Sequence, residues 1–438
     1  MGSRRTTTIA LLVALGCVGG SSAEQARSDG ADGRDMRLRP TNRPTIEAAF
    51  TRESYAAGDV ARLVTWTRGA RVSLQLFRAG TETKRVKARD VMLGTAVTPP
   101  QRIGAASPGG AIRVRIGEWP SGLYFAELRG AGGKVGYAPF VLRPRHLGEA
   151  PVAVVFSTMT WQAYNFHDDD RNGTLDTWYA GDRHARLGRP FENRGVIPHY
   201  KHYEQPFVRW LVATNREVDY LADADLDAVS TTGDRLASAY RLIIFPGHHE
   251  YVTEHEFDVV TAYRNLGGNL MFLSANNFFW RTTKDGNVMT RTARWRRLGR
   301  PEASLVGVQY FGSDRGQHKG PWIATDAPAA AWIFAGTRLK SGSSFARGGI
   351  EADATTPSSP RETEVVARIP NIFGNGCDAE MTYYELPNGA KVFAAGAFTL
   401  AELVCSPQVG RIISNLWSRL GASDASPQPD PPAVGCRG

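Results

Sequence analysis

The stretch LIIFPGHHEYVT (242–253) indicates the fold class of this chain most clearly. Its apolar run LIIF is typical of a strand buried on both faces of a sheet. The turn residues PG follow, and a helix is predicted to run from there to about Asn265. A glycine pair caps that helix and precedes another apolar run, NLMFLSA (269–275). A strand, a helix and a strand in this order predict a parallel sheet with right-handed crossovers.

The sequence on either side continues this alternation of strands and helices. The runs VAVVFS (152–157) and KVFAAGA (391–397) predict two more buried strands. Apolar residues recur with helical spacing in EQPFVRWLVAT (204–214) and in the closing segment QVGRIISNLWSRLG (408–421). We therefore predict an α/β domain over residues 148–421, with a parallel, flavodoxin-like sheet.

Residues 43–147 have a different pattern, with a period of two. Val72, Leu74 and Leu76 alternate with polar residues, and turns rich in glycine and proline separate short segments of this kind. Short alternating strands without a helical period predict an Ig-like β-sandwich, which we expect to act as a scaffold.

Length, composition and charge exclude several classes of protein for this chain. The chain has 438 residues, 42% hydrophobic and 22% charged, so it is long enough for two or three domains and too apolar for overall disorder. Its formal net charge is +9. Basic residues gather between Arg281 and Arg300, but scattered arginines usually form a solvated face, and we expect no nucleic-acid partner. No apolar run reaches the ~20 residues that span a bilayer, so no transmembrane segment is predicted.

The first residues have the pattern of a targeting segment. Residues 1–23 combine two arginines, a short apolar run and a small-residue cleavage site, which is typical of a signal peptide. Residues 24–42 form a polar linker, and residues 422–438 form a tail that is predicted to be disordered. We therefore expect an exported protein, secreted or periplasmic. An alternative in which Cys17 carries a lipid anchor stays open.

Export makes disulfide bonds possible. The chain after residue 23 contains Cys377, Cys405 and Cys436. Because Cys436 lies in the tail, we predict that Cys377 pairs with Cys405. No CxxC motif accompanies these cysteines, which argues against a structural zinc site.

The segment HDDDRNGTLD (167–176) has the pattern of a calcium loop. Such a loop needs oxygen ligands at positions 1, 3, 5 and 9, a backbone carbonyl at position 7 and glycine at position 6. Tyr179 stands where the bidentate glutamate at position 12 is expected, so the alternative is a solvated acidic turn. We predict a structural calcium ion held by Asp168, Asp170, Asn172, Thr174 and Asp176.

Chemically versatile residues follow three neighbouring predicted strands. Ligands bind outside the carboxyl ends of the strands in open α/β sheets, and these turns lie there. His248, His249 and Glu250 are the candidate catalytic residues, although Glu250 alone could simply cap the following helix. No G-x-S-x-G elbow, P-loop or G-x-G-x-x-G follows a strand, so serine hydrolase, NTPase and dinucleotide-binding functions lack support. The candidate substrate contacts are Trp161, Asn276, Asn277 and Trp280.

Taken together, several segments resemble the large (beta) subunit family of N,N-dimethylformamidase. The resemblance covers most of residues 44–421 and implies a β-sandwich followed by a glutamine-amidotransferase-like α/β domain. The matching segments occur in the family's order and are SGLYFAEL (121–128), YAPFVLRPR (137–145), WQAYN (161–165), EQPFVRWL (204–211), REVDYLADADLD (216–227), LIIFPGHHEY (242–251), GGNLMFLSANNFFWR (267–281), LGRPEASLVGVQY (298–310) and TYYELPNGAKVFAAGAF (382–398).

The resemblance also implies a metal centre, because the family's amidase holds one iron through two tyrosines and a glutamate. Carried onto this chain, Glu250 and Tyr164 match best. Tyr203 is our choice for the second tyrosine, with Tyr200 and Tyr179 as alternatives. Phe191 follows Arg-Pro at a place where the family leads us to expect tyrosine, so the triad departs from the pattern there.

Two functions follow from these observations. The first is an exported, metal-dependent hydrolase that acts on a carbon–nitrogen amide bond of a small amide or of a cell-surface substrate. The second is a non-catalytic, calcium-stabilised cell-surface binding protein on the same fold. A homo-oligomer is compatible with either.

Overall fold

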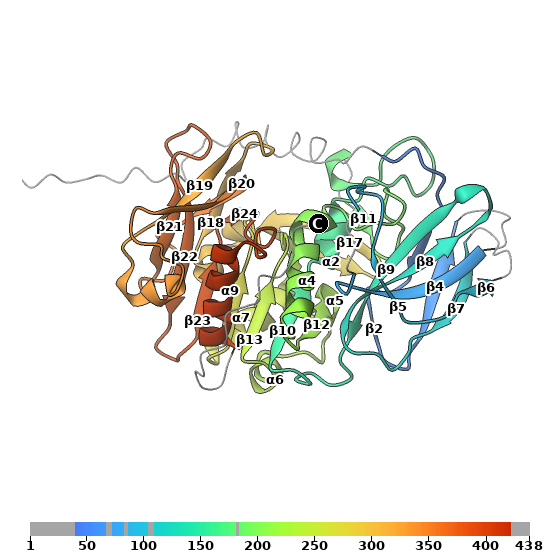
Figure 1. Cartoon of the computed structure of the whole chain (residues 1–438), viewed down its shortest axis with the longest axis horizontal. Helices are drawn as coiled ribbons and strands as arrows, with labels where there is room; N and C mark the ends of the chain where they lie inside the picture. Colours follow the sequence, from blue (N-terminus) through green and yellow to red (C-terminus); the bar gives the residue numbers. More distant parts are fainter. Residues whose placement is uncertain (1–39, 67–71, 83–85, 104–108, 181–183, 422–438) are drawn as a thin grey trace, which may run out of the picture.

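A computed structural model describes residues 40–66, 72–82, 86–103, 109–180 and 184–421. The described chain is rich in β-structure, with four sheets and a few helices (Figure 1). The predicted signal peptide, Cys17, most of the linker and the C-terminal tail lie outside the described residues.

The first part of the chain forms two sheets that enclose a common apolar core. Leu63 and Val114 of one sheet share this core with Leu76 and Phe140 of the other. The smaller sheet has the order β1 (Ala48–Phe50), β3 (Val60–Thr65) and β7 (Gly110–Arg115). The larger sheet has the order β2 (Ser54–Ala56), β9 (Val135–Arg143), β8 (Gly122–Arg129), β4 (Val72–Ala79) and β5 (Gly94–Ala96), with β6 (Gln101–Ile103) also paired to β4.

The central sheet of the second part begins with five parallel strands. Their spatial order is β12 (Asp219–Ala222), β10 (Val152–Phe156), β13 (Leu242–Phe245), β15 (Asn269–Phe272) and β23 (Lys391–Ala394). The chain therefore moves to opposite sides of β10 when it adds β12 and β13. At such a switch point the loops that follow two adjacent strands diverge and leave a crevice.

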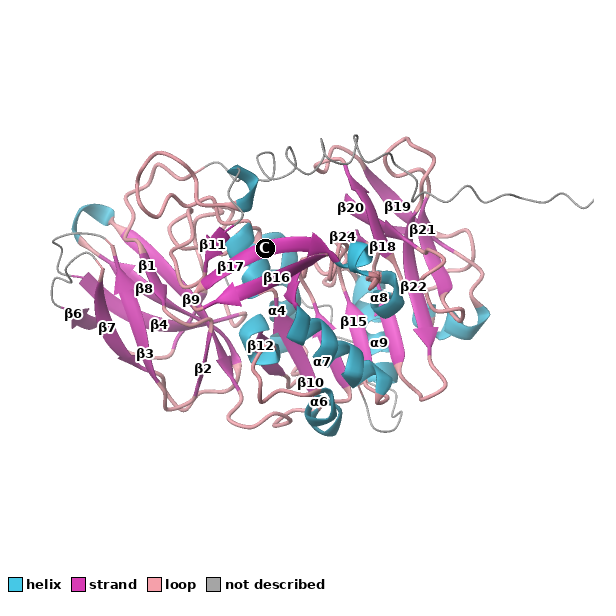
Figure 2. Cartoon of the chain, turned by 180° about the vertical axis from the view of Figure 1, so that it is seen from behind, coloured by secondary structure: helices cyan, strands magenta, loops and turns pink. Residues whose placement is uncertain are grey.

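Helices cover both faces of these parallel strands. Val154 and Ile244 point into a core shared with α4 (Gln205–Ala213) and α9 (Pro407–Leu420). Val155 and Ile243 point into a core shared with α6 (Gly233–Ala239) and α7 (Glu254–Asn265), which Figure 2 shows on the opposite side. Burial on both faces explains why these strands read as continuous apolar runs.

The same sheet continues with antiparallel strands, which the sequence pattern left unassigned. They follow β23 in the order β22 (Ala379–Glu385), β21 (Glu364–Ile369), β19 (Lys319–Ala324), β20 (Ser344–Ala354) and β18 (Gln309–Ser313), with β24 (Ala397–Phe398) paired to β20. A fourth sheet has the order β11 (His184–Arg186), β17 (Val288–Arg294), β16 (Trp280–Asp285) and β14 (Tyr251–Thr253). The stretch interpreted as a basic surface therefore forms much of a hairpin, β16–β17.

The two parts of the chain share a continuous core. Leu123, Phe125 and Val141 of the larger N-terminal sheet belong to the same apolar cluster as Phe207 and Val208 of α4. This packing fixes the N-terminal sheets against the α/β part. None of the described helices is long and apolar enough to cross a membrane.

Candidate active site

The candidate site lies where β10 and β13 end, at the switch point of the parallel sheet. Strand β10 leads into α2 (Thr158–Ala163), and Tyr164 is the residue that ends this helix. Strand β13 leads into the turn that carries His248 and Glu250. Because parallel strands end at the same sheet edge, residues far apart in sequence meet there.

Three of these side chains form a buried contact. The Tyr164 hydroxyl donates a hydrogen bond of 2.7 Å to Glu250 Oε2. His248 Nε2 lies 3.4 Å from the same Glu250 oxygen and 3.4 Å from Oε2 of Glu351, which comes from β20. All four side chains are buried. The structure thus places a tyrosine, a histidine and two carboxylates around one point.

The charge state of this cluster follows from its burial. Burial, together with the charges of His199 and His249, lowers the pKa of His248 to about 3, so its imidazole is neutral at neutral pH. Burial and the charge of Glu250 raise the pKa of Tyr164 well above its usual value. A neutral phenol therefore donates to Glu250 when no cation is near.

Two further tyrosines and an arginine border the cluster. Tyr179, in the short helix η2 (Trp178–Ala180), stacks on the Tyr164 ring with 4.9 Å between ring centroids. Its hydroxyl is hydrogen-bonded to that of Tyr251, the first residue of β14. Burial and the charge of Glu250 also raise the pKa of Tyr179 and of Tyr251 well above 10. The positive charge of Arg291 on β17 acts on Tyr251 in the opposite direction.

Tyr203, our first choice for the second metal-binding tyrosine, lies on another side of the cluster. It is the last residue of α3 (Tyr200–Tyr203), and its ring stacks on Phe398 at 4.8 Å and on His199 at 5.2 Å. Phe398 in turn meets the His248 ring edge-on at 4.9 Å. Tyr203 therefore extends an aromatic wall beside His248, whereas Tyr179 contacts Tyr164 directly.

His249 faces away from this cluster. Its Nε2 lies 2.7 Å from Asp223 Oδ1 and 3.1 Å from Glu256 Oε1, and its ring packs against Phe245 and Phe278. Of the two adjacent histidines, the structure places only His248 beside Glu250.

The candidate substrate contacts divide into two groups. Asn277 exchanges hydrogen bonds with Ser274 inside its own turn, whereas the buried Asn276 Oδ1 makes no hydrogen bond with any described residue. The backbone nitrogen of Asn276 donates to Asp353 at 2.9 Å. Trp280 is covered by the guanidinium group of Arg291, 4.7 Å from its ring centroid.

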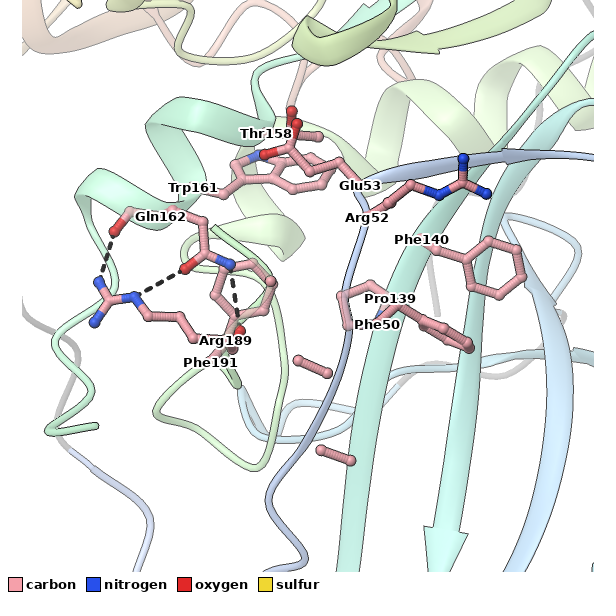
Figure 3. A pocket seen from close by; sticks show the side chains of 13 residues that line it. Phe50, Arg52, Glu53, Pro139, Phe140, Thr158, Trp161, Gln162, Arg189 and Phe191 are labelled. Atoms are coloured by element: carbon pink, nitrogen blue, oxygen red, sulfur yellow. Dashed lines mark hydrogen bonds between the residues drawn. The ribbon is translucent and has the colours of Figure 1, made fainter. Parts of the chain in front are cut away.

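Trp161 belongs to a different apolar cluster from Tyr164 and donates from its indole nitrogen to the buried carboxyl of Glu204 at 2.9 Å. It lines a cavity of about 40 Å³ with Gln162 and Phe191, between α2 and the N-terminal sheets (Figure 3). Gln162 also accepts a hydrogen bond from Arg189 at 3.1 Å. Phe191 thus packs beside Trp161 in this cavity.

A separate small cavity reaches Tyr164 itself. It has a volume of about 20 Å³, roughly the space of one water molecule, and it also borders Asn165 and His199. His199 has a left-handed backbone, with φ of 57°, which is uncommon for a residue with a side chain. The cavity offers a position beside the Tyr164 and His199 side chains for a small group.

The proposed calcium loop is compact and more exposed than the buried cluster. Ligand oxygens of Asp168, Asp170 and Asp176 lie within 4.8 Å of one another. Asp168 accepts hydrogen bonds from the backbone nitrogens of Asn172 and Gly173, and the latter has φ of 87°, as the sharp turn requires. The Thr174 nitrogen donates to Asn172 Oδ1 at 2.7 Å.

Cys377 and Cys405 are both disulfide-bonded in the structure. Their pairing with each other stays our prediction, since Cys17 and Cys436 lie outside the described residues.

The sequence analysis missed Glu351, Tyr251 and Arg291. Tyr251 follows Glu250 in the motif GHHEY, so its position in the sequence was a usable signal. Glu351 and Arg291 belong to antiparallel strands, whose residues carry no local mark of the site they reach.

The comparison with protein families now identifies the class. The family model described as N,N-dimethylformamidase beta subunit-like, C-terminal, matches residues 52–405. The chain belongs to this family, and the suspected resemblance is confirmed. No curated protein matches the chain.

Solved structures resemble the chain only remotely. The mmIFT52 N-terminal domain is 14% identical, with 49% of this chain and 89% of that chain covered and a TM-score of 0.32. A cycloisomaltooligosaccharide glucanotransferase from Paenibacillus sp. is 13% identical, with 29% and 17% covered and a TM-score of 0.17. The superoxide reductase (neelaredoxin) E23A from Ignicoccus hospitalis is 15% identical, with 23% and 82% covered and a TM-score of 0.15.

Proposed function

We propose that the protein is an exported hydrolase that cleaves a carbon–nitrogen amide bond with the help of a single iron ion. The observation that carries this proposal is the buried contact between Tyr164 and Glu250 at the switch point, with His248 beside it. Membership of the N,N-dimethylformamidase-like family supports the same reaction class. The strand order of the parallel sheet supports the glutamine-amidotransferase-like, flavodoxin-like assignment of this part of the chain. The two facing N-terminal sheets support the Ig-like sandwich.

The donor atoms suit ferric iron. Phenolate and carboxylate oxygens are hard anionic ligands, and hard ligands match a hard cation. Tyr164 and Glu250 are already in contact, and Tyr179 stacks on Tyr164. We therefore propose Tyr164, Tyr179 and Glu250 as the ligands, with Tyr203 as the alternative to Tyr179. When bound, iron would polarise the amide carbonyl and activate a water molecule.

The residues around the ligands would move the proton. His248 is neutral, and its buried Nε2 makes no hydrogen bond with a described residue, so this atom is available to accept a proton from the attacking water. Glu351, 3.4 Å from the same nitrogen, would stabilise the imidazolium that forms. The proton would then pass from Nε2 to the leaving amine.

The surroundings favour a small substrate. The cavity beside Tyr164 holds only about 20 Å³, and His199, whose ring stacks on Tyr203, lines it. The amide oxygen of Asn276 has no hydrogen-bond partner in the part of the chain that the structure describes, so Asn276 is a better candidate than Asn277 to contact the substrate.

The test is elemental analysis and a visible spectrum of the purified protein and of the Glu250→Gln variant, followed by a screen of small amides. We expect near-stoichiometric iron and a phenolate charge-transfer band in the wild type. We expect both to disappear in Glu250→Gln while the fold is retained. Full iron occupancy in that variant would falsify the ligand assignment.

A second candidate function is a non-catalytic, calcium-stabilised binding protein at the cell surface. The placement of Phe191 beside Trp161, where the family pattern leads us to expect a tyrosine, favours it. This function requires that the protein contains calcium without iron and binds a cell-wall or glycan ligand without hydrolysing it. Hydrolysis of any amide that depends on Glu250 excludes it.

A further inference from the structure

Asp223, His249 and Glu256 form a second polar cluster, apart from the candidate active site. Asp223 opens α5 (Asp223–Leu226), His249 lies in the turn after β13, and Glu256 lies in the first turn of α7. All three side chains are fully buried. One ligand atom from each lies within 4.8 Å of the other two.

Hydrogen bonding inside this cluster is incomplete. His249 Nε2 is hydrogen-bonded to Glu256 Oε1 at 3.1 Å. Asp223 Oδ1 lies closer to the same nitrogen, at 2.7 Å, but it makes no hydrogen bond with a described residue. Glu256 Oε2 also lacks one. Two buried carboxyl oxygens, Asp223 Oδ1 and Glu256 Oε2, are therefore left without a hydrogen bond to any described residue, and a buried polar atom without a partner is costly.

Other contacts orient two of the three donors, Asp223 and His249, toward their common point. The other Asp223 oxygen, Oδ2, accepts a hydrogen bond of 2.6 Å from the backbone nitrogen of Met159, which leaves Oδ1 facing His249. The His249 ring packs against Phe245 and Phe278, with centroid distances of 4.8 and 5.7 Å. Its carbonyl accepts a hydrogen bond of 2.7 Å from the Phe278 nitrogen. The donors therefore have little freedom to turn away from one another.

We infer that this cluster is a buried metal site with three protein ligands for a divalent transition metal ion, Zn²⁺ being the best match. One imidazole nitrogen and two carboxylate oxygens are common zinc ligands. Donors about 2.1 Å from a tetrahedral ion lie roughly 3.4 Å apart, so the 2.7 and 3.1 Å separations need only small outward shifts. The ion replaces the Nε2 proton, which is released on binding. It joins α5 and α7 to the turn that carries His248 and Glu250.

This inference does not depend on the iron centre, and the experiment separates the two. The Glu250→Gln variant, which removes the proposed iron ligand, is stripped with a chelator and titrated with Zn²⁺ in saturating Ca²⁺. The matched proteins are Glu250→Gln/Glu256→Gln and Glu250→Gln/Asp223→Asn. Bound zinc is measured by elemental analysis, the fold by near-ultraviolet circular dichroism, and Tm by thermal melting.

We expect about one tightly bound Zn²⁺ per chain in Glu250→Gln, with a higher Tm after loading, and loss of both effects in the double variants. If the double variant with Glu256→Gln fails to fold, zinc uptake by the double variant with Asp223→Asn provides the test. If the variant with Asp223→Asn fails to fold, the variant with Glu256→Gln provides it. No tight uptake by folded Glu250→Gln protein overturns the inference. Equal uptake by a folded double variant overturns it too.

Discussion

Tyr164 and Glu250 are 86 residues apart in the chain, yet the hydroxyl of one donates a 2.7 Å hydrogen bond to the carboxylate of the other. They meet because β10 and β13 are adjacent parallel strands and each residue follows one of them. This contact is the centre of the proposed iron site.

The identity of the second tyrosine ligand can be tested by a matched pair of substitutions. Tyr179→Phe should lower iron affinity and weaken the charge-transfer band, because it removes the proposed ligand oxygen of a ring that stacks on Tyr164. Tyr203→Phe should change the band little, because its ring packs on Phe398 instead. The iron content and the visible spectrum of both variants show which tyrosine is the ligand. The opposite ranking would assign the ligand to Tyr203.

Gly247 should affect iron affinity and stability although it has no side chain that could bind the metal. A Cβ at this position would lie 2.5 Å from Glu204 Oε1, in the interior where Glu204 is held by Trp161. Gly247→Ala should therefore shift the turn that carries His248 and Glu250, lower iron affinity, and cost about 1–3 kcal/mol of stability.

Urea unfolding and iron titration measure these effects. Gly286→Ala is the control, because a Cβ there meets nothing within 4 Å, although its φ of 56° adds backbone strain. Unchanged iron affinity in a folded Gly247→Ala protein would contradict the positioning role.

His167 predicts a defined pH dependence of stability. Burial alone would lower the pKa of His167, but hydrogen bonds to Asp169 and Glu47 raise it to about 9. The folded state therefore binds more protons than the unfolded state between pH 6.5 and about 9. This contribution is fully present below pH 6.5 and is lost as the pH rises through about 9.

His167→Gln should accordingly destabilise the protein by about 2–3 kcal/mol at pH 6 and by much less at pH 9.5. Urea unfolding at both pH values measures this difference. His146→Gln, which changes an exposed histidine, is the matched control and should show no such dependence. If His167→Gln lowers the free energy of unfolding equally at both pH values, the ion-pair explanation is wrong.

Calcium should stabilise the loop of Asp168, Asp170 and Asp176, since three carboxylates in close range repel one another without a cation. In the Glu250→Gln background, where iron loss plays no part, EGTA should lower Tm and added Ca²⁺ should restore it. Asp170→Asn should weaken the response. If Tm does not move, the loop is an acidic turn that needs no ion.

The parallel strands and the edge at which their loops meet could be predicted from the sequence. Continuous apolar runs such as 242–245 are needed only where a strand is covered on both faces, so they were recognisable without coordinates. Tyr164 and Glu250 could be paired for the same reason: each follows such a strand, and parallel strands end together.

Which other residues join Tyr164 and Glu250 follows from long-range packing that no local pattern reveals. Glu351 and Arg291 arrive on antiparallel strands whose alternating patterns do not reveal a destination, and Tyr179 reaches Tyr164 through a long irregular loop. The two histidines of the turn show most clearly what the sequence cannot predict. His248 and His249 are adjacent and chemically identical, but side chains of successive residues in an extended turn point in different directions. Packing therefore sends His248 to Glu250 and His249 to Asp223 and Glu256.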